Sequence, residues 1–443
     1  MVTWKLPPDV CQWIGSLAMM LHGRARQRLK PLCLGVLFAR GRRTVTSWLR
    51  AANLTHDYQN YYYFLGALGR KTELLALALL RLVLAVVGVG DRLLFALDDS
   101  PTKRYGPKVQ GAGIHHNPTP GPTDQQFLYG HIWVTLALVL RHTWWDTIAL
   151  PLLAKLYVRQ KDIGKIPKRY GWKFQTKLAL AAALVEWLIS WVRRLGKPVW
   201  IVVDGFYGKK PFLSRASAAG AVIVGKLRKD AGLWSVPPAQ PHRRGRGRPR
   251  KYGKEKLDLA KRAAHQKGWQ TVTVKQYGRE LTKRIKTFLA TWRPAGGVVR
   301  VVIIREAGGW VAFFCTDVQA SVVSILEAAA DRMAIEQVFH DVKEIEGAGQ
   351  QQVRNLWANI AAWHMTLWAY TLVEMWAWRQ PKSAICDRRQ APYDDPDRRP
   401  SHADRRKALQ RSCLRHEFST SVHHPPLSRK IRQLFHAIVK LAA

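Results

Sequence analysis

The spacing of apolar positions changes along this 443-residue chain, and residues 1–88 have the spacing of helices. The sharpest pattern is GRRTVTSWLRAANL (41–54), where Gly41 ends an apolar run and Thr44 can cap a new helix. One face of that helix carries Val45, Trp48, Leu49 and Ala52. Two short helices around a basic turn predict a helix-turn-helix that binds DNA through Arg42 and Arg43, but an ordinary helical pair fits the same pattern.

From residue 91 onward, apolar runs of strand length alternate with helical stretches. Strands are expected at 92–97, 130–141, 143–153, 198–205 and 221–228, and a long helix at 174–195. The order is three strands, a helix, a strand, a short helical link and a strand. This order predicts a mixed α/β sheet.

The remaining half of the chain changes character twice. An Arg-rich stretch, HRRGRGRPRK (242–251), is expected to be flexible, and β-rich runs follow at 269–277, 296–306 and 308–318. Helices resume near Ser324, and the tail from Arg379 is expected to be irregular and polar until a short final helix. The predicted units are a helical domain (1–88), a catalytic domain (89–228 and 319–378), a basic arm with a β-rich insertion (229–318) and the tail (379–443).

Composition narrows the class of partner. The formal net charge of +41 favours an anionic partner, and nucleic acid suits it best, with an anionic membrane surface as the rival. The longest apolar runs are broken by Arg81 and Glu186, and no signal-peptide pattern precedes them, so they predict buried helices and no membrane association. The five cysteines are scattered without any CxxC pair, which is typical of a protein in a reducing cytosol.

Carboxylates follow two of the expected strands. Asp98 and Asp99 end the first, Asp204 ends the fourth, and Glu336 comes from a later helix. Sites in α/β sheets form at the carboxyl ends of strands, and hard oxygen ligands of this kind bind Mg²⁺ or Mn²⁺. Two such ions can activate an attacking oxygen and stabilise the leaving oxygen of a phosphodiester. Together with the basic charge, these residues point to metal-dependent cleavage or transfer of DNA strands.

The helix that carries Glu336 has Arg332 and Lys343 on the same face, four residues before it and seven residues after it. We expect Glu336 to reach the metal ions, and Arg332 and Lys343 to bind DNA phosphates nearby. A solvated salt-bridge face would have the same spacing, because Arg332 and Glu336 form an i,i+4 pair.

The order of these carboxylates resembles that of the RNase H-like DDE transposases of bacterial insertion sequences. The spacing from Arg332 to Glu336 to Lys343 matches the signature of the IS4-like group, although Ala329 stands where members usually have Tyr. Four further stretches are similar to blocks of IS701-like and IS4-like transposases: LDDSPTKRYGPKVQGAGIHHNPTPGPTDQQFLYGH (97–131), VVDGFYGKKPF (202–212), GRGRPRKYG (245–253) and EGAGQQQVRNLWANI (346–360).

The resemblance covers roughly residues 40 to 380 and carries several expectations. It implies metal-dependent cut-and-paste transposition by an enzyme that binds double-stranded DNA at terminal inverted repeats and at a target, as a homodimer on DNA. It implies a bacterial, nucleoid-associated protein and a β-strand insertion between the second Asp and the Glu, where residues 269–318 fall. The family pattern of Asp, any residue, then Ser or Thr favours Asp98 over Asp99 as the ligand, though either stays possible.

Other residues are open to two interpretations. Lys209 and Lys210 follow Asp204 and can touch phosphate or lie on a solvated turn. His115 and His116 can bind metal, contact DNA or be structural. The basic arm is either a DNA tether or a solubilising loop, and its candidate DNA contacts are Arg243, Arg244, Arg246, Arg248 and Arg250. Two alternative functions remain, a catalytically inactive DNA-binding protein derived from a transposase and a nuclease that cuts without joining.

Overall fold

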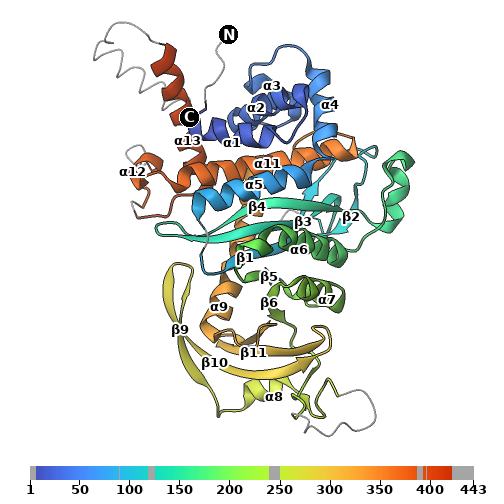
Figure 1. Cartoon of the computed structure of the whole chain (residues 1–443), viewed down its shortest axis with the longest axis vertical. Coiled ribbons are helices and arrows are strands. Elements are labelled where there is room, and N and C mark those ends of the chain that lie inside the picture. The colour runs from blue at the N-terminus through green and yellow to red at the C-terminus, as the bar shows by residue number, and fades with distance from the viewer. Residues whose placement is uncertain are drawn as a thin grey trace.

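The chain folds around one long sheet that is covered by helices on both faces (Figure 1). The structure is a computed structural model that describes residues 6–88, 90–117, 125–238, 250–386, 393–395 and 397–421. Among these residues the sheet has 12 strands in the order β2-β3-β1-β5-β6-β12-β11-β10-β7-β8, with β4 paired to β3 and β9 paired to β10. The expected mixed α/β class is confirmed.

The first part of the chain is helical, as its periodicity predicts. It forms α1 (Pro8–Ala18), α2 (Gly23–Phe38), α3 (Val45–Ala51), α4 (Tyr58–Leu68) and α5 (Thr72–Val87). Thr44 caps α3, since its side-chain oxygen accepts a hydrogen bond of 3.1 Å from the Ser47 N–H. Helix α2 lies so close to α3 that a Cβ at Gly35 would stand 2.2 Å from the Trp48 carbonyl oxygen, so only glycine fits there. The two helices therefore pack as one tight pair.

The first half of the sheet follows. Its strands are β1 (Leu93–Lys103), β2 (Gly113–His116), β3 (Phe127–His142), β4 (Asp146–Tyr157), β5 (Val199–Val203) and β6 (Val222–Leu227). Strands β1, β5 and β6 are parallel to one another, and β3 runs antiparallel to β1 and to β4. The connections include the 3₁₀ turns η1 (Gln160–Lys165), η2 (Lys168–Tyr170), η3 (Arg193–Leu195) and η4 (Gly205–Tyr207), and the helices α6 (Lys177–Val192) and α7 (Lys210–Ala219). Strands β3 and β4 are buried almost throughout, because helices cover both of their faces.

The β-rich insertion extends this sheet and does not form a separate one, because β12 pairs antiparallel with β6. Its elements are β7 (Leu233–Trp234), β8 (Lys256–Leu257), α8 (Leu259–Ala264), β9 (Gln270–Gln276), β10 (Arg279–Trp292), β11 (Gly297–Glu306) and β12 (Gly309–Cys315). The apolar runs predict β9, β11 and β12 but not β10, whose first half alternates charged residues with Leu and Ile. Strand β10 pairs with both β9 and β11 and holds the insertion together.

Helices then return to the sheet as α9 (Val322–Asp331), α10 (Met333–Glu344) and α11 (Leu356–Trp378). The Trp-rich α11 is buried along almost its whole length and packs against β4, α4 and α5. The stacked pair of Trp133 and Trp363, with ring centroids 5.3 Å apart, joins it to the sheet. The N-terminal helices therefore share one hydrophobic core with the catalytic sheet.

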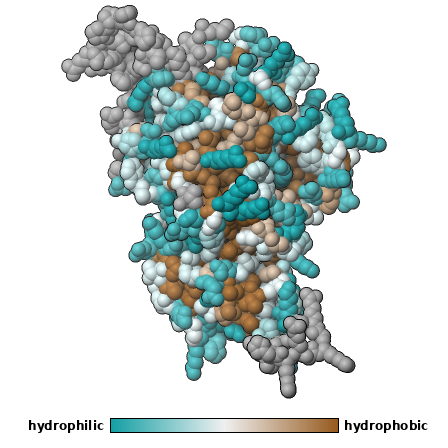
Figure 2. Space-filling view, in the orientation of Figure 1, coloured by the Kyte–Doolittle hydropathy of each residue, from teal (hydrophilic) through white to brown (hydrophobic). Residues whose placement is uncertain are grey.

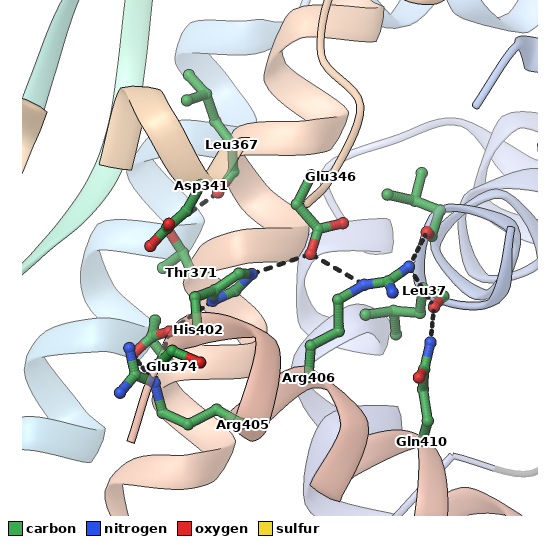
Figure 3. Close-up of polar contacts among 12 residues, drawn as sticks. Leu37, Asp341, Glu346, Leu367, Thr371, Glu374, His402, Arg405, Arg406 and Gln410 are labelled. Carbon is green, nitrogen blue, oxygen red and sulfur yellow. Dashed lines mark hydrogen bonds and ion pairs between the residues drawn. The ribbon is translucent and has the colours of Figure 1, made fainter. Parts of the chain in front are cut away.

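The tail differs from its expected irregular form. It contains α12 (Lys382–Ile385) and the 20-residue α13 (His402–Ser421), while the expected final helix lies outside the described residues. Helix α13 escaped prediction because several of its buried positions are charged. His402 and Arg405 bind Glu374 of α11, and Arg406 donates to the Leu37 carbonyl of α2 (Figure 3).

The surface carries both hydrophobic and hydrophilic side chains. Hydrophobic patches show on the helical layer and on the insertion, and hydrophilic side chains cross them (Figure 2). Among the described residues, no helix combines the length and the apolar character needed to cross a membrane.

Candidate active site

Strand register places Asp98 and Asp204 side by side. Leu97 of β1 is paired with Val203 of β5 in parallel register, and each of the two aspartates is the next residue of its chain. Neighbouring strands lie about 4.8 Å apart, so both carboxylates leave the same edge of the sheet. Asp204 also starts the η4 turn, with its carbonyl accepting a hydrogen bond of 3.0 Å from the Tyr207 N–H.

Glu336 reaches the same place from α10, through Arg332. One guanidinium nitrogen of Arg332 lies 2.8 Å from Asp98 Oδ2, and the other terminal nitrogen lies 2.6 Å from Glu336 Oε1. Arg332 stands at the junction of α9 and α10 with helical backbone angles, so its side chain stays in line with Glu336 one turn later. The predicted pair of Arg332 and Glu336 is therefore not an isolated surface salt bridge, because Arg332 also binds Asp98 of the sheet.

Asp99 points to the opposite face of β1. Its two oxygens accept hydrogen bonds of 2.6 Å from Lys177 Nζ at the start of α6 and of 2.8 Å from the Tyr207 hydroxyl. Successive residues of a strand alternate between faces, so only one of the two aspartates can face α10. That residue is Asp98.

Burial shapes the charges of this carboxylate centre. It raises the pKa of Asp98 from 3.8 to about 7, a rise to which Asp99 and Asp204 add while Arg332 opposes it. Burial by itself lowers the pKa of Arg332, but Asp98, Glu336 and Asp204 outweigh it and leave that pKa raised. Asp98, Asp204 and Glu336 thus all interact electrostatically with the guanidinium of Arg332.

The chemistry of these side chains suits a hard divalent cation. Three carboxylates and one guanidinium, all ionised, carry a net charge of −2, which a divalent cation would neutralise. In the conformation described, however, no group of three or more His, Cys, Asp or Glu side chains among the described residues is arranged to hold a metal ion. Arg332 spans Asp98 and Glu336 instead. The donor set fits Mg²⁺ or Mn²⁺ once Arg332 has another partner.

Lys343 lies apart from this centre. It is seven residues beyond Glu336, about 10 Å along the helix axis. It lines a crevice of about 750 Å³ together with Arg42 and with residues 101–103 at the end of β1. Burial lowers the pKa of Lys343 from 10.5 to about 8. The structure thus brings Arg332 to the carboxylates and Lys343 to a separate basic crevice between α10 and the α2–α3 turn.

The other predicted DNA contacts are dispersed. Lys209 and Lys210 are exposed at the start of α7, close to Asp204. Arg42 is exposed, whereas Arg43 is half-buried and its backbone N–H donates to Gln350 Oε1 at 2.8 Å. Arg250 is exposed, and the remaining arm residues Arg243, Arg244, Arg246 and Arg248 lie outside the described residues.

The two histidines sit on β2, at the edge of the sheet. His115 is buried, and burial together with Arg159 and Lys177 lowers its pKa to about 4. His116 is exposed and packs edge-on against Phe127, with ring centroids 5.8 Å apart. Neither belongs to a metal-binding group among the described residues.

A buried network that local periodicity does not predict fixes β1 to the loop after α10. Arg104 Nε donates to His131 Nδ1 at 3.1 Å, and its terminal nitrogen donates to the Gly349 carbonyl at 2.7 Å. In turn, Gln351 Nε2 donates to the Arg43 carbonyl at 3.1 Å. The one available hint is the stretch EGAGQQQVRNLWANI (346–360), whose glycines and glutamines make these contacts.

Comparison with known families agrees with this geometry. A family model described as DDE superfamily endonuclease matches residues 17–290, which include Asp98 and Asp204 and end before Glu336. No curated protein gives a significant match.

Proposed function

Because the chain belongs to the DDE superfamily endonucleases, we propose that it is a transposase that cuts and joins DNA strands at the ends of an insertion sequence of the IS4-like or IS701-like kind. The proposal goes beyond endonuclease activity by adding strand transfer, specific DNA ends and a mobile element. A homodimer that binds both ends would account for a paired cut.

One observation carries the proposal. Asp98 lies in β1 and Asp204 follows β5 at the point where the parallel pairing of the two strands stops, and Arg332 links Asp98 to Glu336 of α10. Two sheet carboxylates and one helix carboxylate of this kind are the arrangement that metal-dependent phosphodiester chemistry requires. Asp99 is already held by Lys177 and Tyr207, which supports Asp98 as the ligand.

The roles of the side chains follow from their charges. Asp98, Asp204 and Glu336 would hold Mg²⁺ or Mn²⁺, which would activate the attacking oxygen and stabilise the leaving one. Arg332 cannot coordinate a cation, but a DNA phosphate can replace the carboxylates as its partner. Its position between Asp98 and Glu336 would then place the phosphate beside the carboxylates.

Further cations would hold DNA outside the carboxylate centre. Lys343 and Arg42 share one crevice, and Lys209 and Lys210 stand at the start of α7. The arm residues 243–250 would add sequence-independent affinity that fades as salt rises. The contacts of Lys343, Lys209, Lys210 and the arm residues 243–250 would be with the phosphate backbone, which carries no sequence information.

The test is cleavage of a supercoiled plasmid that carries the gene with its flanking DNA. We expect nicking in Mg²⁺ or Mn²⁺, none in a chelator, and joining of cut ends to a second plasmid. Asp204→Asn should reduce cleavage by about 10³-fold or more, as loss of a metal ligand does, while DNA affinity stays within about twofold. The matched control is Asp230→Asn, since Asp230 is an exposed carboxylate whose one ion pair within the described part of the chain is with Arg228.

The outcomes separate the candidate functions. If Asp204→Asn cleaves DNA at the rate of the unaltered chain, Asp204 is not a ligand of the catalytic metal. Metal-dependent cleavage without joining would identify a nuclease that does not transfer strands. Binding without any cleavage by the unaltered chain would identify an inactive DNA-binding relative.

A further inference from the structure

The connection between β4 and α6 is the most basic segment of the described catalytic domain. RQKDIGKIPKRYGWKFQTK (159–177) contains seven Lys or Arg residues and one acidic residue, Asp162. It holds η1 and η2 and projects from the catalytic domain beyond β2, at the right of the view in Figure 1. Residues 158–176 are called the β4–α6 arm below.

The arm is held in shape by its own buried contacts. Asp162 is buried and accepts hydrogen bonds of 2.6 Å from Arg159 Nε and of 2.9 Å from Lys165 Nζ. Farther along, the Asn355 side-chain amide donates to the Tyr170 hydroxyl at 2.8 Å, and Trp172 packs edge-on against Trp357. The backbone of the arm is therefore anchored on α11 and is no flexible loop.

Its free cations face outward. The side chains of Lys161, Lys168 and Lys173 are exposed and make no hydrogen bond or ion pair with any residue that the structure describes. Arg70 lies beside the arm, with its guanidinium 5.7 Å from the Tyr170 ring. A positioned row of unpaired cations repels itself unless an anion binds to it.

The arm leaves the sheet at the edge where the carboxylates lie. Tyr157, the last residue of β4, is paired with Ile132 of β3, and Ile132 is paired with Pro101 of β1, three residues beyond Asp98. The other end of the arm leads into Lys177, whose Nζ lies 2.6 Å from Asp99 Oδ2. Lys177 Nζ also lies 5.9 Å from the centroid of the Tyr157 ring, so both ends of the arm lie near Asp99, on the face of β1 opposite Asp98.

A phenylalanine continues the cationic row to the carboxylate centre. Phe206 follows Asp204 by two residues, is 42 % exposed, and has Lys209 Nζ 4.6 Å and Lys177 Nζ 5.6 Å from its ring centroid. An exposed aromatic ring between two ammonium groups offers a stacking face for a base and charge for the adjoining phosphates. Lys177 thus connects the arm to Phe206.

We propose that the β4–α6 arm and Phe206 form one DNA track, in which the arm binds the phosphate backbone and Phe206 stacks on a base next to the reacting phosphodiester. This inference rests on the proposed function, because it takes DNA as the substrate of the carboxylate centre. It deepens that function by naming the surface that leads the DNA to the carboxylates.

The arm is tested by the triple variant Lys161→Gln, Lys168→Gln and Lys173→Gln in the full chain. The matched control removes three charges at the opposite end of α6, as Arg193→Gln, Arg194→Gln and Lys197→Gln. Affinity for a fluorescein-labelled duplex is measured by anisotropy between about 50 and 200 mM salt. If all three lysines contact phosphates, the slope of log affinity against log salt falls by about 2.7, at roughly 0.9 for each contact, while the control keeps the slope of the unaltered chain.

Phe206 is tested separately with labelled single-stranded DNA. Phe206→Leu keeps apolar volume without a ring and should weaken binding by about fivefold or more, whereas Phe206→Trp should restore it. If Phe206→Leu and Phe206→Trp bind single-stranded DNA equally well, Phe206 does not stack on a base.

The experiments distinguish a failure of the proposed function from a failure of the proposed DNA track. If the unaltered chain neither binds nor cuts DNA, the proposed function fails. If it does both, and the arm variant shows the same affinity and salt slope, only the arm is excluded from the track. Thermal melting of each variant verifies that it is folded.

Discussion

Arg332 lies 2.8 Å from Asp98 and 2.6 Å from Glu336, so one side chain joins a strand residue to a helix residue. The burial that raises the pKa of Asp98 to about 7 makes this contact important, since a buried carboxyl stays ionised only beside positive charge. Lys343 is the contrasting residue, because it is partly buried but has no anionic side chain bound to it among the described residues. Burial causes its lowered pKa of about 8.

Lys343 should therefore bind DNA in a pH-dependent way. Its ammonium form predominates below pH 8 and is lost as the pH rises above about 8, so the affinity of the chain for DNA should fall between pH 7 and pH 9. Lys343→Arg keeps its charge over this range and should remove that part of the fall. Lys343→Gln should bind more weakly at pH 7 and lower the salt slope by about 0.9, the value for one phosphate contact.

The measurement is DNA anisotropy against pH, with Lys197→Gln as the control at the far end of the sheet. The same pH dependence in Lys343→Arg and in the unaltered chain would mean that Lys343 does not contact DNA. Stability has the opposite sign: the unfolded chain binds the Lys343 proton more tightly, so this residue's contribution to the free energy of unfolding rises with pH above about 8.

At the scale of the elements, the α2–α3 pair has the local structure that its sequence pattern predicts, but its turn also binds a loop that is distant in sequence. The Thr44 cap, the left-handed Gly41 at φ +62° and the buried Val45, Trp48 and Leu49 are as the pattern predicts. The turn does not stand free, however, because Arg43 is bound to Gln350 and Gln351 of the loop after α10. Removal of residues 1–88 would also uncover α11, so it cannot test end recognition by itself.

Point variants can test that role. Arg42 and Arg50 are exposed at the start of the turn and near the end of α3. If this pair reads DNA ends, Arg42→Gln with Arg50→Gln should reduce the preference for terminal over random DNA in a competition assay, by about tenfold if each arginine contacts a base. Arg193→Gln with Arg194→Gln is the control and should leave the preference unchanged. A preference that survives in both variants would assign end recognition to another element.

At the scale of the whole molecule, the C-terminal helix ties three distant segments together (Figure 3). His402 Nδ1 lies 2.6 Å from Glu374 of α11, and its Nε2 lies 3.0 Å from Glu346, just after α10. Arg406 pairs with Glu346 at 3.1 Å and donates to the Leu37 carbonyl of α2 at 2.7 Å. This buried cluster fixes the end of the helix that carries Glu336 and Lys343.

The His402 cluster should make stability depend on pH. Burial lowers the pKa of His402, but its hydrogen bonds to Glu346 and Glu374 outweigh burial and leave that pKa raised. The stabilisation is fully present below the ordinary His pKa of about 6.5 and is lost as the pH rises through the raised value. Arg405, Arg406 and Arg43 also face these carboxylates.

His402→Gln leaves two buried carboxylates without one partner, which should reduce the free energy of unfolding by about 3–5 kcal/mol. Urea denaturation near pH 6 and near pH 8.5 measures this, and the pH dependence should be smaller in the variant. His22→Gln, which changes an exposed histidine, serves as the control. An unchanged free energy of unfolding in His402→Gln would show that α13 does not stabilise the fold.

The sequence by itself determined the strands and helices of the catalytic domain, because alternating or continuous apolar runs reflect burial at each position. It also determined that Asp204 ends a strand and that Arg332 and Glu336 share a helix face, since both follow from local periodicity. Asp98 and Asp99 are predicted to end a strand as well, but they lie within β1, which continues to Lys103 through its pairing with β3. These local facts were enough to predict the mixed α/β fold and a carboxylate centre.

Only the tertiary structure decided the rest, because it depends on partners that are distant in sequence. Strand β10 forms through pairing with β9 and β11, and α13 forms where charged residues find buried counterions. Lys177 and Tyr207 draw Asp99 away from α10, while the length of α10 carries Lys343 away from the carboxylates. The β4–α6 arm comes near the carboxylates through tertiary contacts, since Lys177 at its end binds Asp99 and lies beside the ring of Phe206.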